Sequence, residues 1–98
     1  MADYYIHAVN QEKDVIKKVK TCTSYTSSGP GYSTEKTRTS VELDIDIFKK
    51  TIYTIYKNSN GNWTLGAKVI TEKVDGKTYI KTEANGKKCD NLDNIEQY

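Results

Sequence analysis

Alternating apolar and polar residues dominate the second half of the chain and predict three short strands. The runs are rich in β-branched and aromatic side chains, which suit a half-buried pleated surface. They cover residues 51–57, 63–73 and 78–82. Asn60-Gly61 and Asp75-Gly76 separate the runs, and both dipeptides favour the positive φ angles of tight hairpins. Residues 51–84 are therefore predicted to form a three-stranded antiparallel meander.

The N-terminal part of the chain predicts a hairpin followed by a loop. Residues 1–25 contain two strand-like runs, residues 4–9 and 15–25, with a polar turn between them. Residues 26–37 include Gly29-Pro30-Gly31, which cannot sustain a helix or a strand. A loop of about a dozen residues is long for a compact domain, and such loops are often functional.

Residues 38–50 fit either a strand or a helix. Apolar residues at every second position from Val41 to Ile47 are typical of a strand. A helical stripe with one polar member consists of Val41, Asp44, Ile45 and Phe48. Thr39 and Glu42 match a capping box with Thr39 as the N-cap, which favours the helix.

The remaining segment, residues 85–98, is a polar tail in which Leu92 and Ile95 are expected to dock against the domain. Residues 1–98 form a single domain, since 98 residues suit one core. The predicted fold class is α+β, with an antiparallel β-sheet of about five strands and one helix packed on one face.

Charge and composition narrow the classes of partner. The net charge is +2, from 15 basic and 13 acidic residues, which argues against binding to long nucleic acids. No apolar run approaches the roughly 18 residues of a membrane span, and the start of the chain does not resemble an export signal. A cytoplasmic location is therefore expected. A chain of 98 residues can bury only a modest core, and its eight tyrosines are of a type enriched at protein interfaces. Both features favour a homo-oligomer.

The chain offers little for catalysis or metal binding. Cys22 and Cys89 are expected to be free thiols, and with the single His7 they lack the spacing of a zinc site. His7 is interpreted as structural, because no nucleophile motif accompanies it. The acidic residues Glu42, Asp44 and Asp46 are not interpreted as a catalytic cluster, because on a helix Glu42 and Asp46 share a solvated face while Asp44 points elsewhere. No enzyme activity, metal or cofactor is predicted.

Aromatic and basic residues on the predicted meander, with Asn62 and Arg38 at its edges, are the main candidates for ligand binding. Flat rings can stack on a base, and a cation can meet a phosphate group. The candidate residues are Arg38, Tyr53, Asn62, Trp63, Tyr79 and Lys81. The competing interpretation is that the aromatic residues pack the core under the helix. The presence of one arginine in the chain weakens the phosphate interpretation, because arginine is the preferred bidentate phosphate ligand.

Several short motifs resemble those of a small family of uncharacterised bacterial and phage proteins. The shared patterns are Tyr-Tyr-Ile-x-Ala-Val, Tyr-Thr-x-Tyr-Lys, Gly-x-Trp-x-x-Gly-Ala, Gly-x-x-Tyr-(Leu/Ile)-(Arg/Lys)-Thr and Asp-Asn-Leu. In this chain they occupy residues 4–9, 53–57, 61–67, 76–82 and 90–92. The resemblance spans nearly the whole chain and implies no particular biochemistry.

In size and build, the chain is also similar to phage anti-defence sponge proteins of the Thoeris system. That resemblance implies binding of a cyclic ADP-ribose-type signal by an aromatic stack, an asparagine and arginines. The matching positions are Ile52 or Tyr53, Asn62 and Lys81, and lysine at position 81 departs from the pattern.

The resulting hypothesis is a non-catalytic protein that sequesters a nucleotide-derived signalling molecule. The alternative is a protein–protein interaction or inhibitor module.

Overall fold

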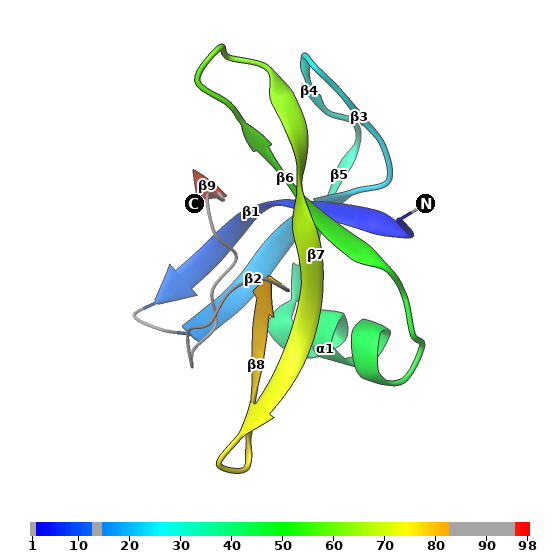
Figure 1. The fold of residues 1–98 in the computed structure, drawn as a ribbon, viewed down its shortest axis with the longest axis vertical. Coiled ribbons are helices and arrows are strands. Elements are labelled where there is room, and N and C mark those ends of the chain that lie inside the picture. The colour runs from blue at the N-terminus through cyan, green and yellow to red at the C-terminus, as the bar shows by residue number, and fades with distance from the viewer. Residues whose placement is uncertain (1, 13–14, 83–95) are drawn as a thin grey trace.

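In the part of the chain that the structure describes, a curved, mixed β-sheet is combined with a small two-stranded sheet and one helix (Figure 1). The computed structural model describes residues 2–12, 15–82 and 96–98. Its elements are β1 (Tyr4–Glu12), β2 (Val15–Cys22), β3 (Tyr25–Thr26), β4 (Gly29–Pro30), β5 (Ser33–Thr37), α1 (Arg38–Asp46), β6 (Ile52–Lys57), β7 (Trp63–Val74), β8 (Lys77–Thr82) and β9 (Glu96–Gln97). The predicted docking of Leu92 and Ile95 lies outside the described residues, as does Cys89.

The main sheet differs from the antiparallel sheet of about five strands that the sequence predicts. Within the described residues it has seven strands, in the order β5-β2-β1-β6-β7-β8, with β9 beside β1. Strand β1 runs parallel to both β6 and β9, so the sheet is mixed. The parallel pair arises because β2, β5 and α1 form a crossover between β1 and β6, a connection that a hairpin cannot make. The broad α+β class is confirmed.

Residues 26–37 are more ordered than the predicted loop. Strands β3 and β4 form a small separate hairpin, and β5 pairs with β2 along the edge of the main sheet. Every residue of β5 except Lys36 is exposed, so the strand carries no apolar alternation that a sequence pattern could reveal. Strand β2 ends at Cys22, before the predicted end at Tyr25.

The helix is confirmed and begins at Arg38 as predicted, but its predicted C-terminal end and its predicted cap were wrong. Helix α1 ends at Asp46, and its N-cap is Thr37, whose side chain accepts a hydrogen bond from the backbone N–H of Ser40. Thr39, the predicted N-cap, lies within the helix. Val41 and Asp44 are buried as the stripe predicts, whereas Phe48 lies beyond the helix end and is 64% exposed.

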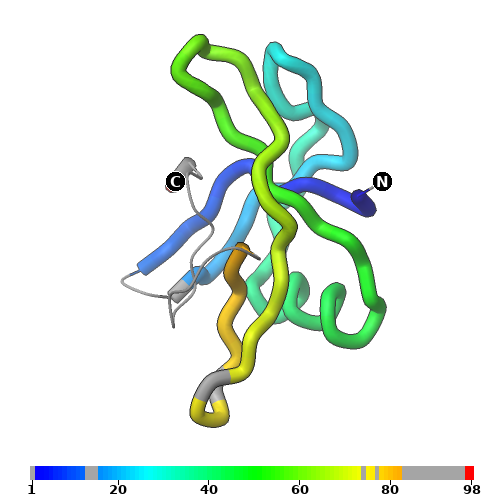
Figure 2. Tube along the Cα trace, in the orientation of Figure 1, coloured from blue at the N-terminus to red at the C-terminus, as the bar shows by residue number. Residues whose placement is uncertain are grey.

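Strand β7 is long and belongs to two successive hairpins, one with β6 and one with β8. Its first part pairs with β6 and its second part with β8, as the continuous curve in Figure 2 shows. The register shifts where β7 passes Thr54, next to Gly66. A Cβ atom at Gly66 would overlap the Thr54 hydroxyl and lie 3.0 Å from the Thr54 carbonyl oxygen, so only glycine fits here without a shift. The predicted Asp75-Gly76 turn is confirmed, with positive φ at both residues.

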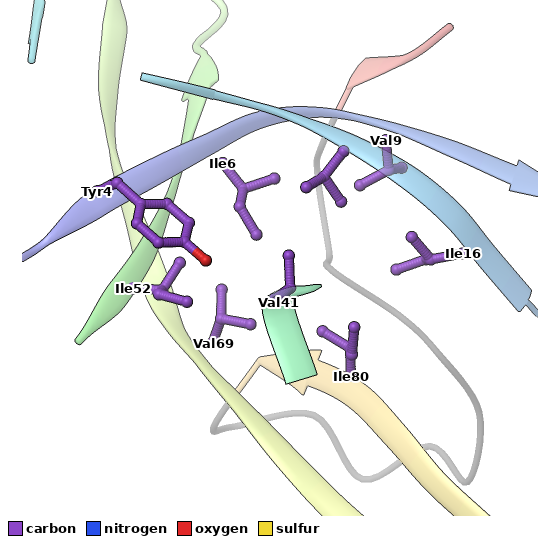
Figure 3. Close-up of a cluster of buried hydrophobic side chains, with 9 residues drawn as sticks. Tyr4, Ile6, Val9, Ile16, Val41, Ile52, Val69 and Ile80 are labelled. Carbon is purple, nitrogen blue, oxygen red and sulfur yellow. The ribbon is translucent and has the colours of Figure 1, made fainter. Parts of the chain in front are cut away.

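The core lies between α1 and the concave side of the sheet. Val41 of α1 is surrounded by side chains from β1 and β2 and from the β7–β8 hairpin (Figure 3). The core residues are Tyr4, Ile6, Val9, Ile16, Val19, Val41, Ile52, Val69 and Ile80. Because side chains alternate along a strand, their neighbours point to the opposite side of the sheet, here called the outer face. Within the described residues, no helix is both long and apolar enough to cross a membrane.

Candidate functional site

Two tyrosines from neighbouring parallel strands lie side by side on the outer face. Tyr5 of β1 is the register partner of Tyr53 of β6, and Tyr53 also pairs with Lys68 of β7. The ring of Tyr5 meets that of Tyr25 edge to face, with centroids 5.0 Å apart and an interplanar angle of 76°. Tyr25 thereby fixes Tyr5 from the β3–β4 side, while Tyr53 remains half-buried.

These tyrosines border a cavity of about 330 Å³, here called the tyrosine pocket. Its lining consists of Ala2, Tyr5, Thr51, Tyr53 and Leu65. The volume lies at the lower end of the range for small-molecule sites, which are typically apolar with a few polar groups. Lys68 does not line the pocket, but it is the register partner of Tyr53 on the same face, and it is exposed. The pocket can therefore accept a flat ring against an aromatic wall, with an anionic group directed towards Lys68.

Trp63 and Asn62 do not line this pocket. The Trp63 ring lies edge to face with His7, at a centroid distance of 6.2 Å and an angle of 85°. The backbone N–H of Trp63 donates to the Ser27 carbonyl oxygen over 3.0 Å. A Cβ atom at Gly29 would lie only 3.5 Å from the indole nitrogen of Trp63. Trp63 therefore packs the β3–β4 hairpin onto the outer face. Asn62 lies in the exposed loop before β7.

Arg38, Tyr79 and Lys81 are located on α1 and β8, away from the tyrosine pocket. Lys81 is 5% exposed, and its ammonium group pairs with the Glu72 carboxylate. Arg38 forms a 3.0 Å ion pair with Glu42 and donates to the Thr78 carbonyl oxygen. The structure thus brings Tyr53 into a pocket but does not bring the six predicted residues into one site.

Lys68 is the register partner of Tyr53, and it was not among the residues selected from the sequence. It belongs to a predicted strand, but the register shift beside Gly66 breaks the alternation of that strand and places Lys68 opposite Tyr53. Tyr5 was also missed, because only a parallel β1–β6 pairing brings it next to Tyr53.

A second, polar pocket of about 310 Å³ opens elsewhere on the outer face. It is lined by His7, Lys20, Ser33, Thr34 and Glu35. His7 is 8% exposed, and its Nε2 atom lies 2.9 Å from the Ser33 hydroxyl in a hydrogen bond. From the sequence, His7 was interpreted as structural because no nucleophile motif accompanies it, and Ser33 is 26 positions away in a segment predicted to be a loop. No local motif could have indicated this pair, which depends on β5 joining β2.

The described residues contain no group of three or more His, Cys, Asp or Glu side chains that could hold a metal ion. Cys22 is a free thiol, as expected, and it is buried. Burial raises the pKa of the Cys22 thiol, against the opposing effect of backbone hydrogen bonds from Gly31 and Ser24. The thiol is therefore poorly suited to act as a nucleophile.

Residues 5–96 match the family model described as "Protein of unknown function (DUF3892)". The chain belongs to this family. The match covers nearly all of the chain, including both pockets apart from Ala2, and it confirms the resemblance to an uncharacterised family. Neither a curated protein nor a solved structure matches the chain.

Proposed function

We propose that the protein binds and sequesters a nucleotide-derived signalling molecule of the cyclic ADP-ribose type, without catalysis, as a phage anti-defence sponge. The observation that supports this function is the tyrosine pocket, where Tyr53 and Tyr5 offer aromatic surface next to the exposed Lys68. A base stacked on an aromatic ring contributes about 1–3 kcal/mol and requires no particular base sequence. Such a protein acts by mass action, so it needs affinity and abundance and no turnover.

The structure changes which residues are expected to carry this function. Tyr53 remains the proposed stacking residue, and Tyr5 joins it. Lys68 replaces Lys81 as the proposed cation, because Lys81 is buried against Glu72. Asn62, Trp63, Tyr79 and Arg38 have no proposed contact with a ligand in this pocket.

Calorimetry with cyclic ADP-ribose isomers and cyclic dinucleotides tests the proposal. Tyr53→Ala is expected to weaken binding about fivefold to 100-fold, whereas Tyr53→Phe keeps the ring and most of the affinity. Tyr79→Ala is the matched control, because Tyr79 is a half-buried tyrosine that does not line the pocket. Lys68→Gln is expected to weaken binding and reduce its dependence on salt. Thermal unfolding of each variant separates lost binding from lost folding.

If the folded protein gives no heat with any of these ligands, the nucleotide proposal is wrong. The alternative, a protein–protein interaction or inhibitor module, is supported by one observation. Leu43 within α1, and Ile47 and Phe48 just beyond its end, are 46%, 65% and 64% exposed. Neighbouring exposed apolar side chains of this size are typical of a contact surface.

The same apolar residues support the expected homo-oligomer. Light scattering measures this directly, and the double variant Ile47→Ser, Phe48→Ser is expected to reduce the mass to that of one chain. A wild-type mass equal to one chain at micromolar concentration contradicts the oligomer. It leaves the nucleotide proposal to be decided by calorimetry.

A further inference from the structure

We propose that the polar pocket is a second binding site, which takes the phosphate group of a small ligand on Lys20 and Ser33, with His7 positioning the Ser33 hydroxyl. The three residues come from three adjacent strands, β2, β1 and β5, and all of them line the pocket. None of them lines the tyrosine pocket, so this inference is independent of the proposed function.

The charges in the pocket favour an anion. Both oxygens of Glu35 are already engaged: one lies 3.6 Å from the Lys18 ammonium, and the other accepts a 2.9 Å hydrogen bond from the Tyr98 hydroxyl. Lys20 lies 4.6 Å from the centre of the Tyr98 ring. Among the described residues, no carboxylate lies within ion-pair distance of Lys20. The positive charge of Lys20 is therefore available to a ligand, while the negative charge of Glu35 is largely compensated.

Tyr98 keeps this arrangement in place at neutral pH. Partial burial, with the hydrogen bond and charge of Glu35, raises the pKa of Tyr98 to about 12. The hydroxyl therefore stays protonated and continues to donate to Glu35. The backbone of Tyr98 is held as well, because its N–H donates to the Val9 carbonyl over 3.0 Å and its carbonyl accepts from Asn10 over 2.8 Å.

His7 and Ser33 are positioned before any ligand arrives. The register shift in β1 occurs at His7, between Ile6 and Ala8, and it keeps His7 on the outer face while Val9 returns to the core. The edge-to-face contact with Trp63 restricts the imidazole ring on one side, and the 2.9 Å hydrogen bond to Ser33 restricts it on another. A rigid donor set loses little conformational freedom on binding, which favours affinity.

Phosphate fits this donor set better than a carboxylate does. His7 and Ser33 are hydrogen-bonded to each other, so the pair presents the Ser33 hydroxyl as its donor to a ligand. That hydroxyl now donates to the Gly31 carbonyl oxygen over 3.5 Å, a long bond that a phosphate oxygen would replace. Lys20 supplies the charged donor, and a phosphate monoester carries close to two negative charges at neutral pH, whereas a carboxylate carries one. The pocket volume of about 310 Å³ leaves room for a small group attached to the phosphate.

The chain contains its own probes for this site. It has one tryptophan and one histidine, and Trp63 and His7 are in contact. Titration with inorganic phosphate at constant ionic strength and constant pH is expected to give a saturable change in Trp63 fluorescence. The same titration is expected to shift the single set of His7 imidazole signals in NMR spectra. Acetate is expected to bind about tenfold more weakly, since it offers one charge and two oxygens.

Variants decide whether the named residues carry the binding. Ser33→Ala and Lys20→Gln are each expected to weaken phosphate binding about tenfold or more, because each removes a donor to a charged group. Lys17→Gln is the matched control: it removes the same charge from an exposed position on β2 outside the pocket. Tyr53→Ala is expected to leave phosphate binding unchanged, which separates this site from the tyrosine pocket.

Three results would overturn the proposal. The first is a folded wild-type protein in which phosphate changes neither the Trp63 fluorescence nor the His7 signals. The second is an equal loss of binding in Lys17→Gln and Lys20→Gln, which would indicate only general charge attraction. The third is acetate binding as tightly as phosphate, which would assign the pocket to carboxylates.

Discussion

Tyr4 donates a 2.7 Å hydrogen bond to Asp44 inside the core and thereby joins β1 to α1. Lys36 lies 3.3 Å from the same carboxylate oxygen, and Lys50 lies 3.8 Å from the other. Burial raises the pKa of Asp44, but the hydrogen bond from Tyr4 and the charges of Lys36 and Lys50 outweigh burial and hold that pKa below its usual value. Asp44 is therefore the one charged residue in the apolar stripe of the helix, and its carboxylate is paired with Tyr4, Lys36 and Lys50.

Asp44→Asn is expected to destabilise the fold by about 1–3 kcal/mol at neutral pH, because Lys36 and Lys50 lose their charged partner. The pKa of Asp44 is lowered on folding from 3.8, so its ionised form stabilises the fold above that pH. This contribution is lost as the pH falls below 3.8 towards the folded pKa. Urea unfolding across this pH range should show the wild-type and variant stabilities converging in acid.

The control for this measurement is Glu12→Gln, at an exposed position at the end of β1. It makes the same change in charge without touching the core, so its stability should follow the wild type at every pH. Parallel pH profiles for wild type and Asp44→Asn would contradict the role of the Asp44 charge.

Gly66→Ala is expected to destabilise the protein by about 1–3 kcal/mol through overpacking against Thr54. Gly76→Ala is a useful comparison, since a Cβ there meets no atom within 4 Å and only the φ of 82° is unfavourable. Adding Thr54→Ala should recover part of the stability that Gly66→Ala loses, and none of the stability that Gly76→Ala loses. Chemical denaturation of the wild type, the three single variants and the two double variants checks this, and strictly additive effects at Gly66 and Thr54 would exclude the steric explanation.

Cys22 is expected to react slowly with iodoacetamide in the folded protein. Its side chain is buried, and burial raises the pKa of the thiol, so little thiolate is available to the reagent. In a Cys89→Ser background, mass spectrometry should show alkylation about a hundredfold slower than for an exposed cysteine, and accelerated by urea. The exposed reference is Thr23→Cys, combined with Cys22→Ala in the same background. Equal rates for the two cysteines would show that Cys22 is accessible.

The local elements of the fold were largely predictable from sequence, and the pairing of distant strands was not. The Asp75-Gly76 turn depends on neighbours in the chain and appears as predicted. The strand over residues 63–73 is present too, but the register shift next to Gly66 breaks its predicted alternation, so that Leu65 is exposed on the outer face and Val69 is buried in the core. The parallel β1–β6 pair depends on a crossover of some 40 residues, for which periodicity contains no signal. Strand β5 was missed because an exposed edge strand needs no apolar side chains.

The same reasoning explains the partial success with the candidate site. Tyr53 was selected for its residue type and strand position, and it does line a pocket. Lys81 was selected as a cation on the same meander, but burial and pairing with Glu72 depend on the tertiary structure. The His7–Ser33 pair requires β5 to join the sheet, so it could not be predicted once residues 26–37 were interpreted as a loop.

Thr37→Ala is expected to destabilise the protein by about 0.5–2 kcal/mol, the usual effect of removing a helix N-cap. The Thr37 hydroxyl accepts from the Ser40 N–H over 3.2 Å, and the alanine variant leaves that donor without its partner in the first turn. Thr39→Ala is the matched control, because Thr39 is an exposed threonine within the helix and alanine has the higher helix propensity. Thermal and urea unfolding should therefore show a loss for Thr37→Ala and no loss for Thr39→Ala. The opposite order would place the N-cap at Thr39, where the sequence pattern predicts it, and would begin the helix two residues later.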